Sequence, residues 1–132
     1  MNFYTRKLIK PEDLNAGNTL FGGSLLRWLD EEAAIYAIIQ LGTKRCVTKF
    51  ISEINFVSSV RQGEIIELGI KATHFGTTSL TLTCQVRNKL TQQLILTIDK
   101  MVFVAVDENG TPAPHGKTAI TYTDERLREN DQ

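Results

Sequence analysis

Residues 15–41, NAGNTLFGGSLLRWLDEEAAIYAIIQL, join a turn-rich loop to a long amphipathic segment with an alanine-rich middle. The loop ends in two glycines, Gly22 and Gly23. Ser24 carries a side chain that is favoured at helix N-caps, and Gly42 is typical of the residue that ends a helix. Together these signals predict a helix over about 24–41.

Asp30 is the unusual residue of this predicted helix. At about 100° per residue it falls inside an apolar arc, near Leu26. Burying an ionised carboxylate costs several kcal/mol unless a polar group meets it. Asp30 therefore either faces a wet site, pairs with a buried Lys or a backbone N–H, or lies at the rim of a helix that is rotated from the expected angle. The arc consists of Leu26, Leu29, Ala33, Ala34, Ala37 and Leu41.

Gly22 and Gly23 precede Asp30 by about two helical turns. Bare backbone N–H groups and the positive end of the helix dipole favour an anionic or polarised ligand at such a place. A carboxylate near these donors is the arrangement of a base or nucleophile beside an oxyanion site. The glycines are equally explained by a tight entry into the helix, and Asn15 by an Asx-turn that shapes the loop.

Length and charge narrow the class of protein. The 132 residues, 42% of them hydrophobic, suffice for one domain with a real core, and we expect a single domain over 1–132. Fifteen basic and fifteen acidic residues cancel, which argues against binding of nucleic acid or membrane surfaces through bulk charge. No apolar run has transmembrane length and residues 1–7 lack a signal-peptide pattern, so we expect a cytoplasmic location.

Metal and triad chemistry are disfavoured by the spacing of the cysteines and histidines. Cys46 and Cys84 lie in strand-like stretches, as buried thiols do. His74 and His115 have no neighbouring ligand at the spacing of a zinc site, and no Ser-His-Asp arrangement is apparent. We therefore predict no metal site.

The rest of the chain alternates like β-structure. Strands are predicted over about 2–8, 46–57, 66–73, 80–87 and 94–106, the last being apolar on both faces as in a central or interface strand. In 46–57, Cys46, Thr48, Phe50, Ile54 and Phe56 are expected on one face, and in 66–73, Glu67 and Gly69 are expected to point outward. Residues 111–132 are predicted to be an irregular or flexible C-terminal tail, with a charged stretch over 125–129.

This order predicts an α+β fold, an antiparallel five-stranded sheet wrapped around one long helix. One helix cannot cover both faces of such a sheet, and a long apolar edge strand invites pairing. We therefore expect self-association into at least a dimer.

Several segments also resemble a known family. The pattern Asp13-x-Asn15, Phe21-Gly22-Gly23 and Leu29-Asp30 is similar to that of the hotdog-fold acyl-CoA thioesterases, and in particular to the bacterial acyl-CoA thioester hydrolases related to the brain-type cytosolic acyl-CoA hydrolase. The similarity extends from about residue 5 to 110, through 53–56, 63–66, 76–80 and 103–107. Val57-Ser58-Ser59 stands where relatives often carry Lys-Pro, and Gly17-Asn18 reverses an Asn-Gly order.

The resemblance implies acyl-CoA hydrolysis with Asp30 as the catalytic carboxylate, acting as general base or nucleophile. It implies that Asn15 reaches the site of a neighbouring subunit, and that the Gly23 N–H polarises the thioester carbonyl. Further substrate-binding residues are expected to be Phe21, Gly22, Ser58, Ser59, Arg61, Gly76, Thr77 and Thr78. It also implies a dimer that assembles as a trimer of dimers, and no cofactor beyond the coenzyme A of the substrate.

Other interpretations of these residues and of the function of the fold stay open. Lys44, Arg45, Arg61 and Lys100 are candidate cations for the coenzyme A phosphates, although each is also explained as ordinary surface charge. The same fold could serve as a non-catalytic acyl-CoA sensor or as a structural oligomer, but neither gives a reason for Asp30 on an apolar face. Hydratases of this fold use a histidine, and the loop before the helix contains none. Residues such as Phe50, Ile54 or Tyr36 are expected to shape the end of the acyl pocket.

Overall fold

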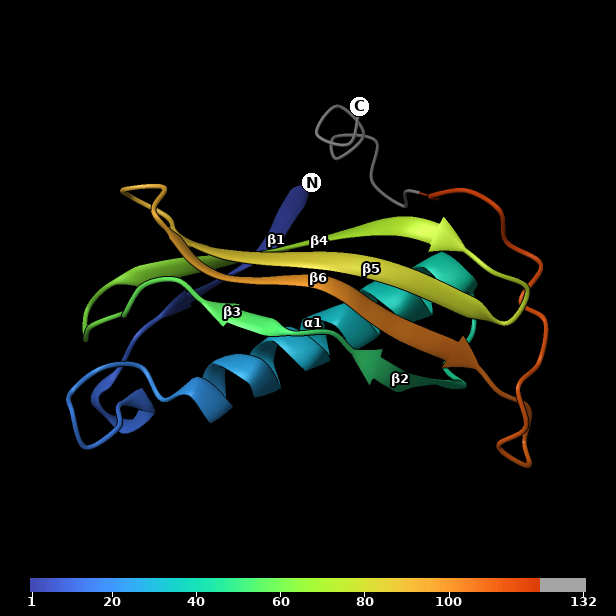
Figure 1. Ribbon diagram of the computed structural model, residues 1–132, viewed down its shortest axis with the longest axis horizontal. Coiled ribbons are helices and arrows are strands. Elements are labelled where there is room, and N and C mark those ends of the chain that lie inside the picture. Colours follow the sequence, from blue (N-terminus) through green and yellow to red (C-terminus); the bar gives the residue numbers. More distant parts are fainter. Residues whose placement is uncertain (122–132) are drawn as a thin grey trace.

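The computed structural model describes residues 1–121, in which one helix packs against a single antiparallel sheet (Figure 1). The strands lie in the order β1-β4-β5-β6-β2, and β3 also pairs with β6. This is the predicted α+β hotdog arrangement. The elements are β1 (Asn2–Leu8), the short 3-10 helix η1 (Pro11–Asp13), α1 (Gly22–Leu41), β2 (Cys46–Ile51), β3 (Ile54–Phe56), β4 (Ile65–Phe75), β5 (Ser79–Asn88) and β6 (Leu94–Ala105).

Helix α1 begins two residues earlier than the sequence predicted. Phe21 occupies the N-cap position with extended backbone angles, and its carbonyl accepts hydrogen bonds from the N–H groups of Ser24 and Leu25. Ser24 is therefore inside the helix and caps nothing, because both glycines adopt helical angles. Gly42 ends the helix as predicted, in the left-handed conformation with φ 70°.

The buried face of α1 is rotated from the predicted arc. Leu26 and Ala34 are only half-buried, whereas Leu25, Tyr36 and Gln40 are buried. Asp30 consequently lies at the margin of the buried face and is half-buried. The rotation gives the carboxylate access to a cavity instead of placing it in the core.

The predicted strand over 46–57 is interrupted at Ser52 and Glu53, so the sheet has six strands where five were expected. A β-bulge at Lys49 also shifts the pairing of β2 with β6 between Thr48 and Phe50. One extra residue reverses the alternation of side chains. Thr48 pairs with Phe103 and Phe50 pairs with the next residue of β6, Val102, so Phe50 does not share the face of Thr48. The predicted common face was wrong for Phe50.

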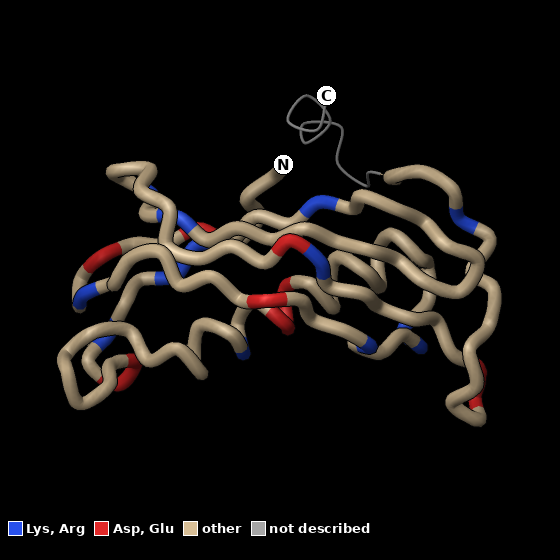
Figure 2. The backbone as a smooth tube through the Cα atoms, in the orientation of Figure 1, with Lys and Arg blue, Asp and Glu red and all other residues tan. Residues whose placement is uncertain are grey.

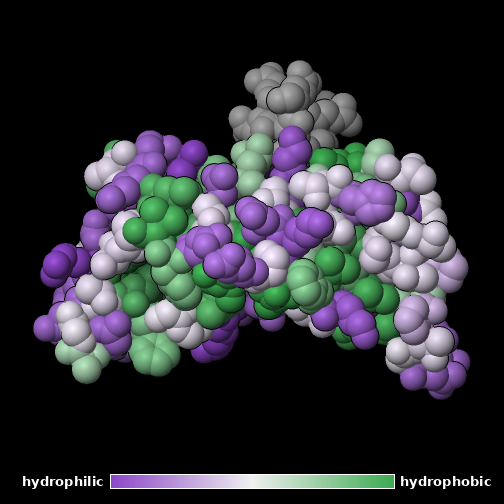
Figure 3. All heavy atoms as spheres, viewed as in Figure 1, coloured by the Kyte–Doolittle hydropathy of each residue, from purple (hydrophilic) through white to green (hydrophobic). Residues whose placement is uncertain are grey.

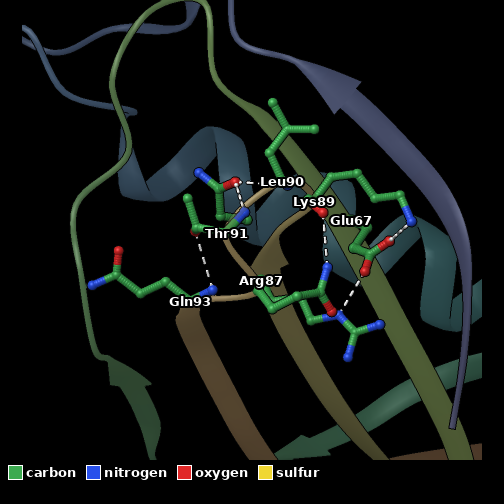
Figure 4. Close-up of polar contacts among 8 residues, drawn as sticks. Glu67, Arg87, Lys89, Leu90, Thr91 and Gln93 are labelled. Atoms are coloured by element: carbon green, nitrogen blue, oxygen red, sulfur yellow. Dashed lines mark hydrogen bonds and ion pairs between the residues drawn. The ribbon is translucent and has the colours of Figure 1, made fainter.

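Strand β4 buries Ile66, Leu68 and Ile70 as predicted, but Glu67 and Gly69 on its outer face are buried as well. The Phe3 ring and the Met1 sulfur lie over Gly69, where any side chain would collide with them. Figure 4 shows Glu67 with its two cations, Arg87 and Lys89. This outer patch is thus covered by the start of β1 and neutralised by an ion network.

Strand β6 is central, as predicted, with β5 on one side and β2 and β3 on the other. After it, residues 107–121 contain no helix or strand, but hydrogen bonds hold the segment to the domain. Both polar atoms of the buried Gln40 side chain pair with the backbone of Thr121, each at 2.7 Å. The predicted tail is therefore irregular but attached up to this point, and the charged stretch 125–129 lies outside the described residues.

Charge and apolarity follow the expectations from composition. Figure 2 shows basic and acidic residues dispersed along the molecule, in keeping with the zero formal net charge. Within residues 1–121 no helix has both the length and the apolarity needed to cross a membrane.

Candidate active site

A cavity of about 400 Å³ lies between α1 and the β2, β3 and β6 strands. Its walls are mostly aliphatic, and Asp30 and Arg27 are the charged residues among them. The lining residues are Gly23, Leu26, Arg27, Leu29, Asp30, Ile51, Ile54, Ile98 and Met101. An apolar pocket with a few convergent polar groups is the usual form of a small-molecule site.

The Asp30 carboxylate is held from across the cavity by β2. The Thr48 Oγ1 hydroxyl donates a hydrogen bond of 3.0 Å to Asp30 Oδ1. Among residues 1–121, no hydrogen bond to the other carboxylate oxygen, Oδ2, accompanies it. Thr48 was not predicted as a site residue, although it was expected on the inward face of its strand. A polar residue at that position, opposite a carboxylate on the helix, was the signal that could have identified it.

Gly23 lies on the wall of the same cavity, in the first turn of α1. The first N–H groups of a helix have no acceptor within the helix, so the Gly23 N–H is available to a ligand. The Phe21 ring packs closely over this glycine, since an added Cβ would lie 2.8 Å from its Cε1 atom. The structure therefore brings the predicted oxyanion donor and the predicted carboxylate to one cavity.

The Asn15 side chain, unlike Asp30 and Gly23, makes its hydrogen bonds within its own loop. Its Oδ1 atom accepts hydrogen bonds from the N–H groups of Gly17, at 2.9 Å, and Thr19, at 3.2 Å. Its Nδ2 atom donates to Thr19 Oγ1 at 3.1 Å. This is the Asx-turn that the sequence allowed, and Asn15 is not among the residues that line the cavity of its own chain. It shapes the loop that precedes α1.

The remaining predicted substrate-binding residues fall into two groups at opposite ends of the molecule. Ser58, Ser59 and Arg61 follow β3, on the side where α1 begins, and the Ser58 hydroxyl is bound to the Leu94 carbonyl at 2.7 Å. Residues 76–78 form the β4–β5 turn, on the right of Figure 1, whereas α1 begins on the left. One chain alone does not bring the two groups together. The candidate phosphate-binding cations Lys44, Arg45, Arg61 and Lys100 are all exposed.

Two aromatic rings, those of Phe21 and Phe56, lie next to the N-terminus of α1. Phe21 is 54% exposed and Phe56 is 56% exposed, and the Phe56 ring lies 3.4 Å from a Cβ built on Gly22. Side chains larger than hydrogen at the two glycines would press on these rings. The glycines thus let two aromatic rings close over the helix start.

A local irregularity of the sheet creates the cavity walls. Ile51 of β2 pairs with Met101, and Ile54 of β3 pairs with Ile98. All four side chains line the cavity, although the two residues on each side of this pairing are three positions apart. Between them the chains bulge outward, and Ser52 binds the Lys100 backbone through its N–H, at 2.8 Å, and its hydroxyl, at 3.0 Å. Ile54 lines the cavity as expected, but Ile51 takes the place expected for Phe50. Tyr36 is buried and is not among the lining residues.

No metal centre accompanies this site in the described part of the chain. Among residues 1–121, no group of three His, Cys, Asp or Glu side chains is arranged to hold a metal ion.

Comparisons with known proteins identify the family and agree with the fold. The model of the thioesterase superfamily matches residues 17–95. The acyl-CoA thioester hydrolase YciA of Salmonella typhimurium is 30% identical over 115 residues, which cover 83% of this chain and 86% of that protein. A hexameric thioesterase from Yersinia pestis superposes with a TM-score of 0.78 at 27% identity, over 86% of this chain and 93% of that chain.

A second solved structure is an acyl-CoA hydrolase from Staphylococcus aureus in complex with butyryl coenzyme A, coenzyme A and coenzyme A disulfide. It has a TM-score of 0.77 and 27% identity, over 95% of this chain and 74% of that chain. Mutants of that hydrolase, also solved, carry alanine in place of an aspartate, a threonine or an asparagine. Since the superfamily model covers more than half of the sequence and the Salmonella enzyme matches most of it, the chain belongs to the thioesterase superfamily, in the family of the acyl-CoA thioester hydrolases.

Proposed function

We propose that the chain hydrolyses acyl-CoA, with Asp30 as the catalytic carboxylate. Water adds to the thioester carbonyl carbon, the C–S bond breaks, and a fatty acid and free coenzyme A result. The observation that carries the proposal is the presence of Asp30 and the Gly23 N–H on one apolar cavity. An acyl chain would occupy the aliphatic part, and the thioester would lie between the two groups.

Each group has a defined part in this reaction. The Gly23 N–H, at the positive end of α1, would stabilise the oxyanion that develops on the carbonyl oxygen. Asp30 would take a proton from the attacking water as general base. Attack by the carboxylate itself, through an anhydride that water then hydrolyses, is the second form of the same proposal. Thr48 would hold one carboxylate oxygen, so that the other is aimed at the water or the carbonyl carbon.

The mutants of the Staphylococcus hydrolase support these roles. Its replaced asparagine and aspartate are as far apart in sequence as Asn15 and Asp30. Its replaced threonine follows the aspartate at one residue less than the interval from Asp30 to Thr48. These residue types and intervals support the proposed roles of Asn15, Asp30 and Thr48.

We further propose that the chain works as a dimer, and as a trimer of dimers. Among residues 1–121, β2 pairs with β6 alone, so its other edge is open, and it carries the exposed Val47 and Phe50. Figure 3 shows apolar areas between polar ones on the face where β2 and β3 lie. A second copy would cover this edge, and Asn15 and the 76–78 turn would serve the site of that copy. The hexameric Yersinia thioesterase supports the larger assembly.

Two expectations from the sequence stay predictions. A hydrolysis that needs only water and a good thiolate leaving group calls for no cofactor, so coenzyme A would enter solely as part of the substrate. The cytoplasmic location is likewise a prediction.

The test is release of free thiol from acetyl-, hexanoyl- and palmitoyl-CoA by the wild type and by Asp30→Asn, with a blank for Cys46 and Cys84. We expect turnover by the wild type and a loss of more than about 10²-fold in the variant, with circular dichroism unchanged. Full activity in the variant would exclude Asp30 as the catalytic group. Binding of acyl-CoA without any turnover by the wild type would favour the sensor.

A further inference from the structure

The exposure of the cavity residues defines a mouth and an inner end. Gly23 and Arg27, in the first two turns of α1, are exposed, so these residues border the mouth. Leu29 is 0% exposed, and Ile98 and Met101 are 1% exposed each, so they close the inner end. If the thioester lies between Gly23 and Asp30, as proposed above, an acyl chain must extend toward this inner end.

Met101 differs from the other two residues of the inner end in its flexibility. Leu29 belongs to the buried face of α1, and Ile98 is β-branched and stiff at χ1. A methionine side chain has three rotatable bonds and by itself would make an adaptable wall. Here a second sulfur fixes it, because the Cys84 Sγ thiol donates to the Met101 Sδ atom at 3.4 Å.

The Cys84 thiol can serve as this donor at neutral pH because it is protonated there. Burial, together with the negative charge of Asp30, raises the pKa of the Cys84 thiol to about 12. The thiol therefore keeps its proton and remains a donor.

We propose that Met101, fixed by Cys84, is the specificity-determining residue that ends the acyl pocket and limits the length of the acyl chain. Cys84 acts as a positioning residue, because it is fully buried behind Met101 and does not line the cavity. This assignment depends on the proposed thioesterase activity. It concerns the acyl chain, which is the part of the substrate that the inner end would contact. It separates two roles, since Asp30 and Gly23 act on the thioester whereas the sulfur pair acts on the far end of the chain.

The experiment compares kcat/KM across straight-chain acyl-CoA esters from butyryl to palmitoyl. Met101→Ala opens space continuous with the cavity, so the longest ester that is well hydrolysed should gain at least two carbons. A buried methylene adds up to about 0.8 kcal/mol, so two of them should raise the relative kcat/KM for that ester about tenfold. Met101→Val should shift the profile in the same direction by less, and it is the milder variant if the alanine variant does not fold.

Two further variants separate the pocket from general loosening of the core. Leu82 is also fully buried and pairs with Met101 across β5 and β6, but it does not line the cavity. Leu82→Ala should therefore lower the melting temperature and leave the chain-length profile unchanged. Cys84→Ala should broaden the chain-length profile without moving its short-chain side. Met101 would still line the inner end, but its side chain would lack the sulfur contact that holds it in one conformation.

The outcomes distinguish this inference from the proposed function. If the wild type hydrolyses no acyl-CoA, the thioesterase proposal itself fails. If the wild type is active but Met101→Ala and Met101→Val keep its profile, the inner end is elsewhere and the assignment of Met101 is wrong. A shift of the same size in Leu82→Ala would show that loosening of the core, and not the pocket wall, changes the preference.

Discussion

The hydrogen bond between Thr48 and Asp30 can be tested by replacing Thr48 with valine, which keeps the shape of the side chain and removes its hydroxyl. The hydroxyl of Thr48 lies 3.0 Å from Asp30 Oδ1, a distance at which it donates a full hydrogen bond to the carboxylate. Hydrogen bonds to charged groups contribute about 1.5–3 kcal/mol. Thr48 is exposed as a residue, so water can replace part of the lost bond.

We therefore expect Thr48→Val to lose about 1–1.5 kcal/mol of transition-state stabilisation, which corresponds to roughly a 5- to 12-fold fall in kcat. KM should change little, because the bond is made to the proposed catalytic carboxylate and not to the substrate. The assay is thiol release from a short-chain acyl-CoA at saturating substrate, with circular dichroism to confirm the fold.

Thr48→Ser is the matched control, since it keeps the donor and removes a methyl group. The serine variant should retain kcat within about twofold if the hydroxyl is the feature that matters. Wild-type kcat in Thr48→Val would refute the idea that this bond orients Asp30. Equal losses in both variants would instead point to packing of the threonine methyl group.

Two predictions concern stability. Tyr36→Phe removes the buried acceptor of the Ala72 N–H, which lies 3.0 Å from the phenol oxygen, and should lower the free energy of unfolding by about 1–3 kcal/mol in urea; an unchanged midpoint would refute this. Burial would raise the pKa of Glu67, but the hydrogen bond and charge of Arg87, helped by Lys89, hold it below the ordinary value of 4.5. The stabilisation by Glu67 is therefore complete at neutral pH and is lost as pH falls below about 4.5. The stability difference between the wild type and Glu67→Gln should shrink in that range, and a constant difference would contradict the ion network.

The parts of the fold that follow regular periodicities could be predicted from the sequence. The alternation of Ile66, Leu68 and Ile70 fixed the inward face of β4, and the helix-length apolar pattern with Gly42 at its end located α1. These signals succeed because each residue's neighbours in space are set by its own element. Asp30 was singled out as a charge on the predicted apolar arc of this helix, although the helix is rotated and Asp30 lies at the margin of the buried face.

Features that depend on packing between distant segments could not be predicted. Glu67 appeared to be a solvent-facing residue, since nothing local indicates that Phe3 and Met1 cross the outer face above Gly69. Similarly, the rotation of α1 about its axis is decided by how Tyr36 and Gln40 fit against β4 and the chain near Thr121. A wheel drawn from one helix contains no information about these partners.

The single extra residue at the β2 bulge determines which side chains form the walls of the cavity. Without the bulge at Lys49, strict alternation would place Phe50 on the same face as Thr48 and would turn Ile51 outward. With the bulge, Thr48 reaches Asp30 and Ile51 joins Met101 at the pocket, so one side of the strand supplies both the polar contact and the apolar wall. A bulge has no reliable signature in one sequence, because it is a compromise between two paired strands. Asp30 could therefore be proposed from the sequence as a candidate catalytic carboxylate, whereas the shape of the space that it faces required the structure.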